Sequence, residues 1–242
     1  MVLVPAGPFT MGSNHGLQNE RPVHQVNLAD FYIDQYEVTN AQFAEFLNQQ
    51  KIQNQDISFY LPELNDNSDI YLEGTTWSVF EGLEDHPVNI VSWTGANAYC
   101  QWRGGRLPTE AEWEKAARGT DERTYPWGEA ITCNVANFFG APDGGPCRDY
   151  TTPVGSYPNG ISPYGAYDMV GNVWEYVHSI YKDYPYDATD GREDNTNTDA
   201  TLRVLRGGSW NYGISFAPVT YRNNDFRLNP DLNVGFRCAA EP

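Results

Sequence analysis

Apolar and polar positions alternate in two short segments near the start of the chain. Residues 26–28 and 31–33 read Val-Asn-Leu and Phe-Tyr-Ile, so an apolar side chain occurs at every second position. Successive side chains of a strand point to opposite faces of a sheet. This period of two therefore predicts two strands, and the strand-like pattern ends at residues 37–39.

Helical spacing follows in two further segments. Thr39 and Gln42 stand at the spacing of a capping box, in which each side chain accepts a hydrogen bond from the other residue's backbone. The apolar face of this helix is predicted to consist of Phe43, Phe46 and Leu47. A second helix through residues 96–102 would place Tyr99 and Trp102 on one stripe.

A third helix has the clearest predicted boundaries. Thr109 and Glu112 form another capping box. Gly119 is placed to end the helix, because glycine readily adopts the left-handed conformation of a C-terminal stop. The buried face is predicted to consist of Trp113, Ala116 and Ala117.

Long polar stretches interrupt this pattern. Residues 51–85 are acidic, polar and aromatic, and we interpret them as an exposed insertion centred on residues 65–69. Residues 187–200 contain no aliphatic core residue and are predicted to form a mobile loop. After Gly119 the periodicity is weak, so cross-links, aromatic packing and bound ions are expected to help hold the chain together.

Composition and charge narrow the classes of partner. We interpret residues 1–242 as one domain, with a formal charge of -17 from 32 acidic and 15 basic residues. A surface this negative repels phosphate backbones and anionic lipids, so nucleic acid is not an expected partner, whereas divalent cations are. No apolar run reaches the roughly 18 to 20 residues that span a bilayer, so membrane insertion is not expected. The start of the domain directly after Met1 is consistent with a piece of a longer protein or with a mature form.

Three motifs in combination make the chain resemble a known family. Residues 106–114 read Arg-Leu-Pro-Thr-Glu-Ala-Glu-Trp-Glu, residues 171–175 read Gly-Asn-Val-Trp-Glu, and residues 206–210 read Arg-Gly-Gly-Ser-Trp. The chain thus resembles the formylglycine-generating-enzyme family, also called the sulfatase-modifying-factor family, from residues 4–7 to residues 235–238. The resemblance implies an α+β, C-type-lectin-like fold with a small twisted antiparallel sheet, two to three helices and extensive irregular loops.

The chain departs from active members of the family at two positions. Those members carry a copper-binding cysteine pair shortly after the Gly-Gly-Ser-aromatic motif, and here the matching positions are Tyr212 and Ala217. Neither side chain can supply the thiolates that Cu(I) favours, so copper is not expected and no catalytic residue is assigned. The resemblance places Ser209 beside these positions, where we expect it to hydrogen-bond the backbone.

Four cysteines allow two disulfides. Cys100 and Cys238 match a disulfide of family members, and in the chain-entropy model closing so long a loop contributes roughly 4 to 5 kcal/mol. Cys133 and Cys147 bracket a loop that contains Gly and Pro, and a bond between them would staple that loop. The alternative is four reduced thiols in a cytoplasmic protein. The compartment therefore stays open: extracytoplasmic or on the surface of a bacterium if the disulfides form, cytoplasmic otherwise.

The resemblance also implies two structural calcium sites. The first would use Asp168, Gly171, Val173 and Glu175, since a tight glycine turn lets two carboxylates and two carbonyls converge on a hard cation. The alternative makes Asp168 a turn residue and Glu175 the partner of a buried arginine.

The second calcium site would use Asn137, the carbonyl of Phe138 and Asp149, with Asp143 as a substitute for Asp149. No catalytic metal is expected at the histidines, because no two of them have the spacing of a zinc or non-haem iron site. These residues are His15, His24, His86 and His178.

Ligand recognition is predicted within the C-terminal region, residues 206–238. Aromatic side chains with short polar neighbours offer a large contact area at low cost in conformational entropy. The predicted ligand-binding residues are Tyr212, Ile214, Phe216, Tyr221, Asn223, Asp225, Phe226 and Leu228. The alternative is that half of these aromatic residues belong to the core and the Asn residues form turns. Residues 211–234 contain no Lys, Glu, Gln, Met or Trp, as in the variable proteins of diversity-generating retroelements.

The sequence favours a non-catalytic module that binds a protein or peptide on this C-terminal loop face, on a calcium-stabilised scaffold. A variable protein of a diversity-generating retroelement is one form that such a module takes. The alternatives are an oxygen-dependent sulfatase-modifying or sulfoxide-forming enzyme, or a maturation factor, with non-cysteine metal ligands or a partner domain. The oligomeric state is not determined by these patterns.

Overall fold

The computed structural model describes residues 1–53, 56–62, 68–140, 145–195, 201–226 and 231–242. Its central sheet has the strand order β10-β7-β8-β9. These strands are Val234–Phe236, Trp174–Ile180, Leu202–Arg206 and Asn223–Phe226. The predicted sheet was antiparallel, and most of this one is, but β10 runs parallel to β7.

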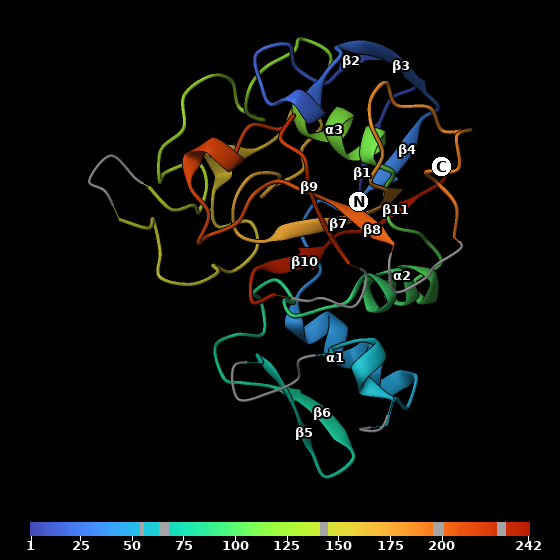
Figure 1. Cartoon of the computed structure of the whole chain (residues 1–242). Helices are drawn as coiled ribbons and strands as arrows, with labels where there is room; N and C mark the ends of the chain where they lie inside the picture. The colour runs from blue at the N-terminus through green and yellow to red at the C-terminus, as the bar shows by residue number, and fades with distance from the viewer. Residues whose placement is uncertain (54–55, 63–67, 141–144, 196–200, 227–230) are drawn as a thin grey trace.

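A second sheet brings the two ends of the chain together. Its order is β1-β4-β11, and both outer strands pair antiparallel with β4. The strands are Val2–Val4, Phe31–Ile33 and Ala239–Ala240. Figure 1 shows the N- and C-terminal ends close to this sheet. A separate antiparallel pair, β2 (Gly7–Met11) and β3 (His24–Leu28), follows β1.

The three predicted helices form, and both predicted capping boxes are present. Helix α1 spans Asn40–Gln49 after the cap Thr39, and α3 spans Glu110–Arg118 after the cap Thr109. Helix α3 ends at Gly119, which has a φ of 71°. Helix α2 spans Trp93–Trp102 and begins three residues before the predicted segment, because Ser92 accepts a hydrogen bond from Gly95 and caps the helix there.

The predicted insertion at residues 51–85 has an exposed outer side in its described part, but it also contains regular structure and buried residues. Strands β5 (Ile70–Glu73) and β6 (Thr76–Val79) form a hairpin that packs on α1. Figure 1 shows α1 between this hairpin and the central sheet. The segment contributes four buried side chains to the core, namely Ile57, Leu61, Ile70 and Trp77. The strands have apolar residues at every second position, Ile70 with Leu72 and Trp77 with Val79, a short period that the polar composition of the segment outweighed in the sequence analysis. Residues 63–67 lie outside the described residues.

Both predicted disulfides are confirmed. Cys100 in α2 bonds to Cys238 next to β11, and Cys133 bonds to Cys147. The described part of the predicted loop at 187–200 is a turn around Arg192, which is 1% exposed and pairs with Asp190 at 2.8 Å.

Short 3₁₀ turns connect the regular elements. The turns η1 and η4 lie near the cavity described below, η2 belongs to the insertion, and η3 lies before β7. In chain order they are Gln18–Glu20, Ile57–Phe59, Pro158–Gly160 and Ile214–Phe216.

Candidate functional site

The motif residues that carry the family resemblance form a buried charge network. Arg206 is fully buried, and its guanidinium pairs with Glu114 of α3. Glu114 also accepts a hydrogen bond from Arg118 at 3.1 Å. A second pair joins Arg222 to Glu110 at 2.6 Å. The motifs at residues 106–114 and 206–210 therefore encode a scaffold behind the site, not a set of reactive groups.

The backbone of the glycine motif lies in conformations that favour glycine. Gly207 and Gly208 have φ values of 95° and 77°. A Cβ on Gly208 would lie 3.1 Å from the carbonyl oxygen of Phe216. Gly207 and Gly208 thus let the chain turn tightly and allow residues 216–217 to lie directly against Gly208.

Four aromatic rings cluster at this turn. Tyr212 meets Trp174 edge-on at a ring-centroid distance of 5.5 Å and meets Phe216 at 5.1 Å. Tyr221 lies 5.1 Å from Phe216 and 5.9 Å from Trp174. Trp174 is 1% exposed, whereas the other three rings are half-buried and pack on the core. The inner edges of Tyr212, Phe216 and Tyr221 therefore pack on the core, and none of these three rings is fully buried.

The two positions where active relatives hold cysteines differ in environment. Tyr212 is half-buried at the surface, and Ala217 is 2% exposed within the core. All four cysteines of the chain are used in the two disulfides, so no thiol is free for a metal or a substrate.

The predicted ligand-binding residues outside the ring cluster also lie at or near the surface. Ile214 is 43% exposed and Phe226, at the end of β9, is 48% exposed. Asn223 and Asp225 are half-buried on β9, and Leu228 lies outside the described residues. Sequence reasoning missed Phe139, which is 45% exposed and whose backbone donates to the carbonyl of Tyr212 at 2.9 Å.

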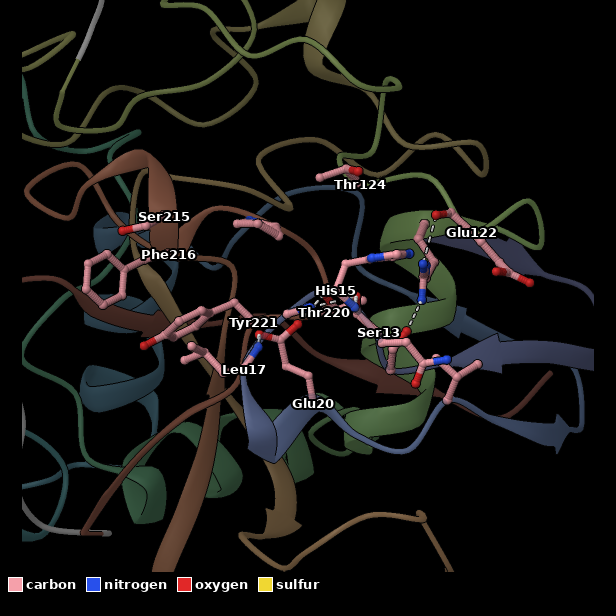
Figure 2. Close-up of a pocket in the computed structure, with 16 residues that line it drawn as sticks. Ser13, His15, Leu17, Glu20, Glu122, Thr124, Ser215, Phe216, Thr220 and Tyr221 are labelled. Atoms are coloured by element: carbon pink, nitrogen blue, oxygen red, sulfur yellow. Dashed lines mark hydrogen bonds between the residues drawn. The ribbon is translucent and has the colours of Figure 1, made fainter.

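A cavity of about 730 Å³ adjoins the ring cluster. One wall comes from the loop between β2 and β3, another from the end of α3, and a third from residues 215–221. Figure 2 shows Phe216, Tyr221 and Leu17 on one side and Ser13, Glu122 and Thr124 on the other. The sequence did not indicate the N-terminal loop as part of the site, because nothing local marks contacts between segments about 200 residues apart.

Glu20 lines this cavity, is 3% exposed and contacts two of its walls. Its carboxylate accepts hydrogen bonds from the backbone of Leu17 at 2.8 Å and from the hydroxyl of Thr220 at 2.7 Å. The side-chain oxygens are thus satisfied by hydrogen bonds from two segments of the chain. Glu20 therefore joins the N-terminal loop to the C-terminal region.

The residues predicted for the first calcium site surround one buried turn. Asp168 is 6% exposed and accepts a hydrogen bond from the backbone of Gly155 at 2.6 Å. Gly171 has a φ of 80°, and a Cβ there would lie 2.3 Å from the carbonyl oxygen of Asn137. This approach explains why the turn needs glycine. Val173 is fully buried in the same turn.

More buried carboxyl groups than cationic side chains lie near this turn. Arg237 donates two hydrogen bonds of 2.7 Å to Glu175, as in the alternative of a buried arginine partner. Glu37, which sequence reasoning missed, accepts from the backbone of Val173 at 3.3 Å. Burial, then the charges of Asp168 and Glu175, raises the pKa of Glu37 well above its usual range. Burial also raises the pKa of Asp168 to about 6. Three buried carboxylates thus face one guanidinium, a charge imbalance that a divalent cation would reduce.

The second predicted calcium site contains an unpaired oxygen. Asn137 is fully buried, and its side-chain oxygen lacks a hydrogen-bond partner, while its amide nitrogen donates to the carbonyl of Tyr150 at 2.8 Å. The carbonyl of Phe138 accepts from Cys147, and Asp149 is exposed. A buried amide oxygen without a donor suits a calcium ligand. The predicted substitute, Asp143, lies outside the described residues.

The histidines are not arranged as a metal centre. His24 accepts from the backbone of Tyr186 at 2.8 Å, and His86 contacts the hydroxyl of Thr151 at 2.8 Å. His178 lies between Glu193 and Asn195, and His15 lines the cavity. Over the described ranges, no three His, Cys, Asp or Glu side chains are grouped so as to hold a metal ion. Calcium at either predicted site would therefore depend on carbonyl and amide oxygens as well. In the described residues, no helix is long and apolar enough to cross a membrane.

Comparison with known proteins agrees with this geometry. The sequence model of one protein family, the sulfatase-modifying factor enzyme 1-like domain, matches residues 1–242 of this chain. The serine/threonine-protein kinase pkn1 of Chlamydia caviae is 37% identical over 242 residues, which cover 99% of this chain and 37% of that protein. The chain thus spans little more than a third of this relative. The inactive C-alpha-formylglycine-generating enzyme 2 of Bos taurus is 34% identical, with 99% of this chain and 87% of that protein covered.

Solved structures show the same architecture. PvdO from Pseudomonas aeruginosa superposes with a TM-score of 0.76 at 27% identity, covering 99% of this chain and 93% of that one. Variable protein 1 of Treponema denticola has a TM-score of 0.70 at 23% identity, covering 100% and 95%, and supports the fold alone. The predicted fold is confirmed.

Proposed function

This chain belongs to the sulfatase-modifying factor family, and we propose that it is a non-catalytic member that binds a protein or peptide on the face around residues 212–217. The observation that carries the proposal is the half-buried ring cluster of Tyr212, Phe216 and Tyr221, which stands beside a cavity of about 730 Å³. Aromatic rings that rest on a rigid core give contact area at low entropic cost.

The chemistry of the site argues against the oxygen-dependent reaction. Cu(I) favours thiolate ligands, and the two matching positions hold a phenol and a methyl group, Tyr212 and Ala217. The name of the bovine relative also describes an inactive enzyme of this family. A binding role requires a contact surface and no catalytic group. Variable protein 1 of T. denticola has the same fold, and its name refers to variation.

We further propose that calcium stabilises the scaffold. Two features support it: the three buried carboxylates near Arg237 and the unpaired side-chain oxygen of Asn137. Calcium accepts six to eight oxygen ligands, including carbonyls and amides. The backbone of Gly171 donates to the carbonyl of Gly207, and that of Phe139 donates to the carbonyl of Tyr212, so calcium bound beside Gly171 or Phe138 would help hold the turn that carries the ring cluster.

The binding proposal is tested with a phage-displayed library of random peptides selected on the purified chain. We expect the wild type to enrich a consensus and the Ile214→Asp variant to lose it, because aspartate would place a charge among the exposed apolar side chains of this face. The Phe226→Asp variant tests whether the face extends to the end of β9. Leu3→Asp is the matched control, since Leu3 is 46% exposed on β1, outside this face. Equal enrichment by all three variants would contradict the proposal.

The competing catalytic function is tested by oxygen uptake. The purified chain is given Cu(I) and a cysteine-containing sulfatase-motif peptide, and its metal content is measured by elemental mass spectrometry. We expect no turnover and no stoichiometric copper. Turnover with bound copper or iron would establish an enzyme with different metal ligands and would overturn the non-catalytic assignment.

A further inference from the structure

The shorter disulfide loop is connected to the turn that carries the ring cluster. The backbone of Cys147 donates to the carbonyl of Phe138 at 2.9 Å. The backbone of the next residue, Phe139, donates to the carbonyl of Tyr212, also at 2.9 Å. Residues 138–139 therefore lie between the disulfide and the turn, and a backbone hydrogen bond joins them to each side.

Phe139 contacts both segments along its backbone. It forms an antiparallel bridge with Pro146, which precedes Cys147, and a parallel bridge with Gly213, which follows Tyr212. Its side chain is 45% exposed, so these backbone contacts position the residue more than the packing of its ring does. A displacement of the segment at Cys147 would therefore disturb a backbone contact of Tyr212.

The disulfide fixes the returning segment of this loop. Cys133 and Cys147 are 14 residues apart, and the bond between them closes the loop. Gly140 donates to Gly145 at 3.0 Å, and Cys147 donates to residue 138. Single backbone hydrogen bonds contribute little net stability and open locally. Reduction would leave the segment held by these two bonds and by the packing of one small side chain, since Cys147 is 9% exposed.

The two disulfides differ in how far a reductant can reach them. Cys100 and Cys238 are both 0% exposed. Cys133 is half-buried, and both of its neighbours in the chain are exposed. Thiol–disulfide exchange requires a thiolate to attack one of the two sulfurs, so access to the sulfur limits its rate. A reductant at low concentration therefore reaches the bond between Cys133 and Cys147 first.

We propose that the bond between Cys133 and Cys147 is a redox switch of the binding face, opened by a dithiol reductant. With the bond formed, Phe139 is held against Tyr212 and the turn is fixed. With the bond reduced, this contact is lost, and the ring cluster loses the fixed geometry that makes binding favourable. This inference rests on the proposed binding function and adds the regulation of that face.

The exchange has two steps. A thiolate of the dithiol attacks Sγ of Cys133, forms a mixed disulfide with it and releases Cys147 as a thiolate. The second thiol of the reductant then attacks its own sulfur in the mixed disulfide and releases Cys133. Two electrons pass to the protein, the two thiol protons end on Cys133 and Cys147, and the dithiol becomes a disulfide.

The first test needs no ligand. The full chain is treated with increasing dithiothreitol in the absence of denaturant, free thiols are blocked with iodoacetamide, and the blocked cysteines are located by peptide mass spectrometry. We expect Cys133 and Cys147 to be blocked at concentrations that leave Cys100 and Cys238 bonded. Reduction of the Cys100–Cys238 bond first, or of both bonds together, would overturn the proposal.

Hydrogen exchange followed by NMR measures the link to the turn. In the selectively reduced chain the amide of Phe139 should exchange at least about tenfold faster than in the oxidised chain, because its acceptor Tyr212 is no longer held against it. The amide of Trp113, which donates to Thr109 in α3, is the control and should be unchanged. An unchanged rate at Phe139 would overturn the proposal. Equally faster exchange at Phe139 and Trp113 would show general unfolding and would overturn it too.

A double variant, Cys133→Ser with Cys147→Ser, reproduces the reduced state without a reductant. The amide of Phe139 should exchange fast in this variant, and dithiothreitol should not change its rate. Slow exchange there would contradict the switch. Near-UV circular dichroism shows whether the variant folds, and the selectively reduced wild type supplies the same comparison if it does not.

The random peptide library separates the switch from the binding function itself. It is selected on the oxidised chain and on chain whose Cys133 and Cys147 have been reduced and alkylated, at one calcium concentration. We expect the consensus peptide to bind the reduced form at least about tenfold more weakly. Equal binding to both forms would overturn the switch and leave the binding face standing. If neither form enriches a consensus, the proposed function fails, and the switch fails with it.

Discussion

Tyr212 meets Phe216 edge to face, with ring centroids 5.1 Å apart, directly beside the buried Ala217. Tyr212 and Ala217 occupy the two positions that the family resemblance assigns to cysteines, and the Tyr212 ring meets the buried Trp174 edge-on. The ring pair is therefore supported from beneath by the core, as the proposed contact surface requires.

The partial burial of this pair predicts a moderate stability cost. Tyr212→Ala should lower the free energy of unfolding by about 1 to 2 kcal/mol, because part of the ring packs on the core. Ile214→Ala, at an exposed position, should change it by less than about 0.5 kcal/mol. Urea unfolding measures both. A loss above about 3 kcal/mol for Tyr212→Ala would assign that ring to the core.

The buried charge network should be far more sensitive than a surface pair. Glu114→Ala leaves the buried Arg206 and Arg118 without their shared carboxylate, so we expect a loss of about 3 to 5 kcal/mol. Arg123→Ala breaks the more exposed pair with Asp121 and should cost less than about 1 kcal/mol. Denaturant unfolding compares them, and similar costs would show that the network does not hold the scaffold.

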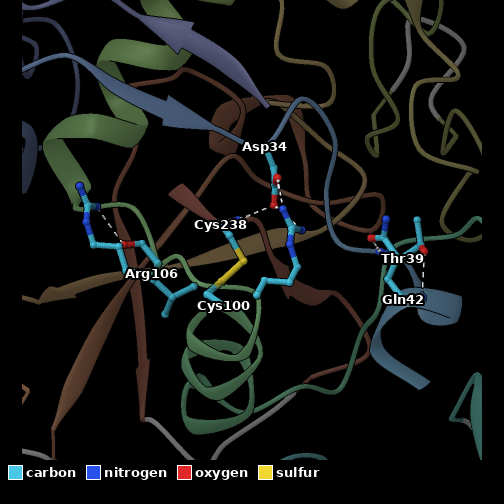
Figure 3. The surroundings of a disulfide bond; sticks show 8 residues. Asp34, Thr39, Gln42, Cys100, Arg106 and Cys238 are labelled. Atoms are coloured by element: carbon cyan, nitrogen blue, oxygen red, sulfur yellow. Dashed lines mark hydrogen bonds and ion pairs between the residues drawn. A yellow bond between two sulfur atoms is a disulfide. The ribbon is translucent and has the colours of Figure 1, made fainter. Parts of the chain in front are cut away.

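The two disulfides should differ in their contribution because they close loops of different length. Cys100 and Cys238 are separated by 138 residues, and Cys133 and Cys147 by 14. In the chain-entropy model, replacing each pair by serine costs about 5 and about 3 kcal/mol, respectively. Figure 3 shows the longer link beside Asp34, which accepts from the backbone of Cys238. Unfolding of the two double variants measures the difference, and a larger cost for the shorter loop would contradict the entropic explanation.

His86 should make stability depend on pH. Burial lowers the pKa of His86, against the raising effects of Asp69 and Asp85. His86 therefore binds a proton more readily in the unfolded chain than in the folded one. The stability that its burial contributes is complete above about pH 6.5 and is lost as the pH falls toward the pKa of His86 in the folded chain. His86→Gln should flatten the slope of unfolding free energy below that pH, while His15→Gln, at an exposed histidine, serves as the control. An unchanged slope in His86→Gln would assign the acid sensitivity elsewhere.

Calcium should raise the melting temperature if the second site forms as proposed. Asn137→Ala removes the unpaired side-chain oxygen, so the calcium-induced increase should shrink, whatever the variant's own stability. Asn134→Ala is the control, since Asn134 is an exposed asparagine in the same segment. Calorimetry with calcium and with chelator gives the readout. An equal calcium effect in both variants would place calcium elsewhere.

Local hydrogen bonding could be predicted because all its partners lie within a few residues. Thr39 with Gln42 and Thr109 with Glu112 form their capping boxes as the spacing requires. The order of motifs was likewise enough to identify the family and its fold, and the resemblance paired the cysteines correctly.

Only the tertiary structure decided which distant segments meet. Thr220 donates to Glu20 across 200 residues, which builds the cavity, and Glu37 joins Asp168 near Arg237. Apolar residues of the insertion are buried because its hairpin folds over α1, and this contact joins elements that are well separated in the sequence. Capping and helical spacing depend on residues close together in the chain and can therefore be predicted from the sequence. Burial and charge balance depend on the path of the whole chain.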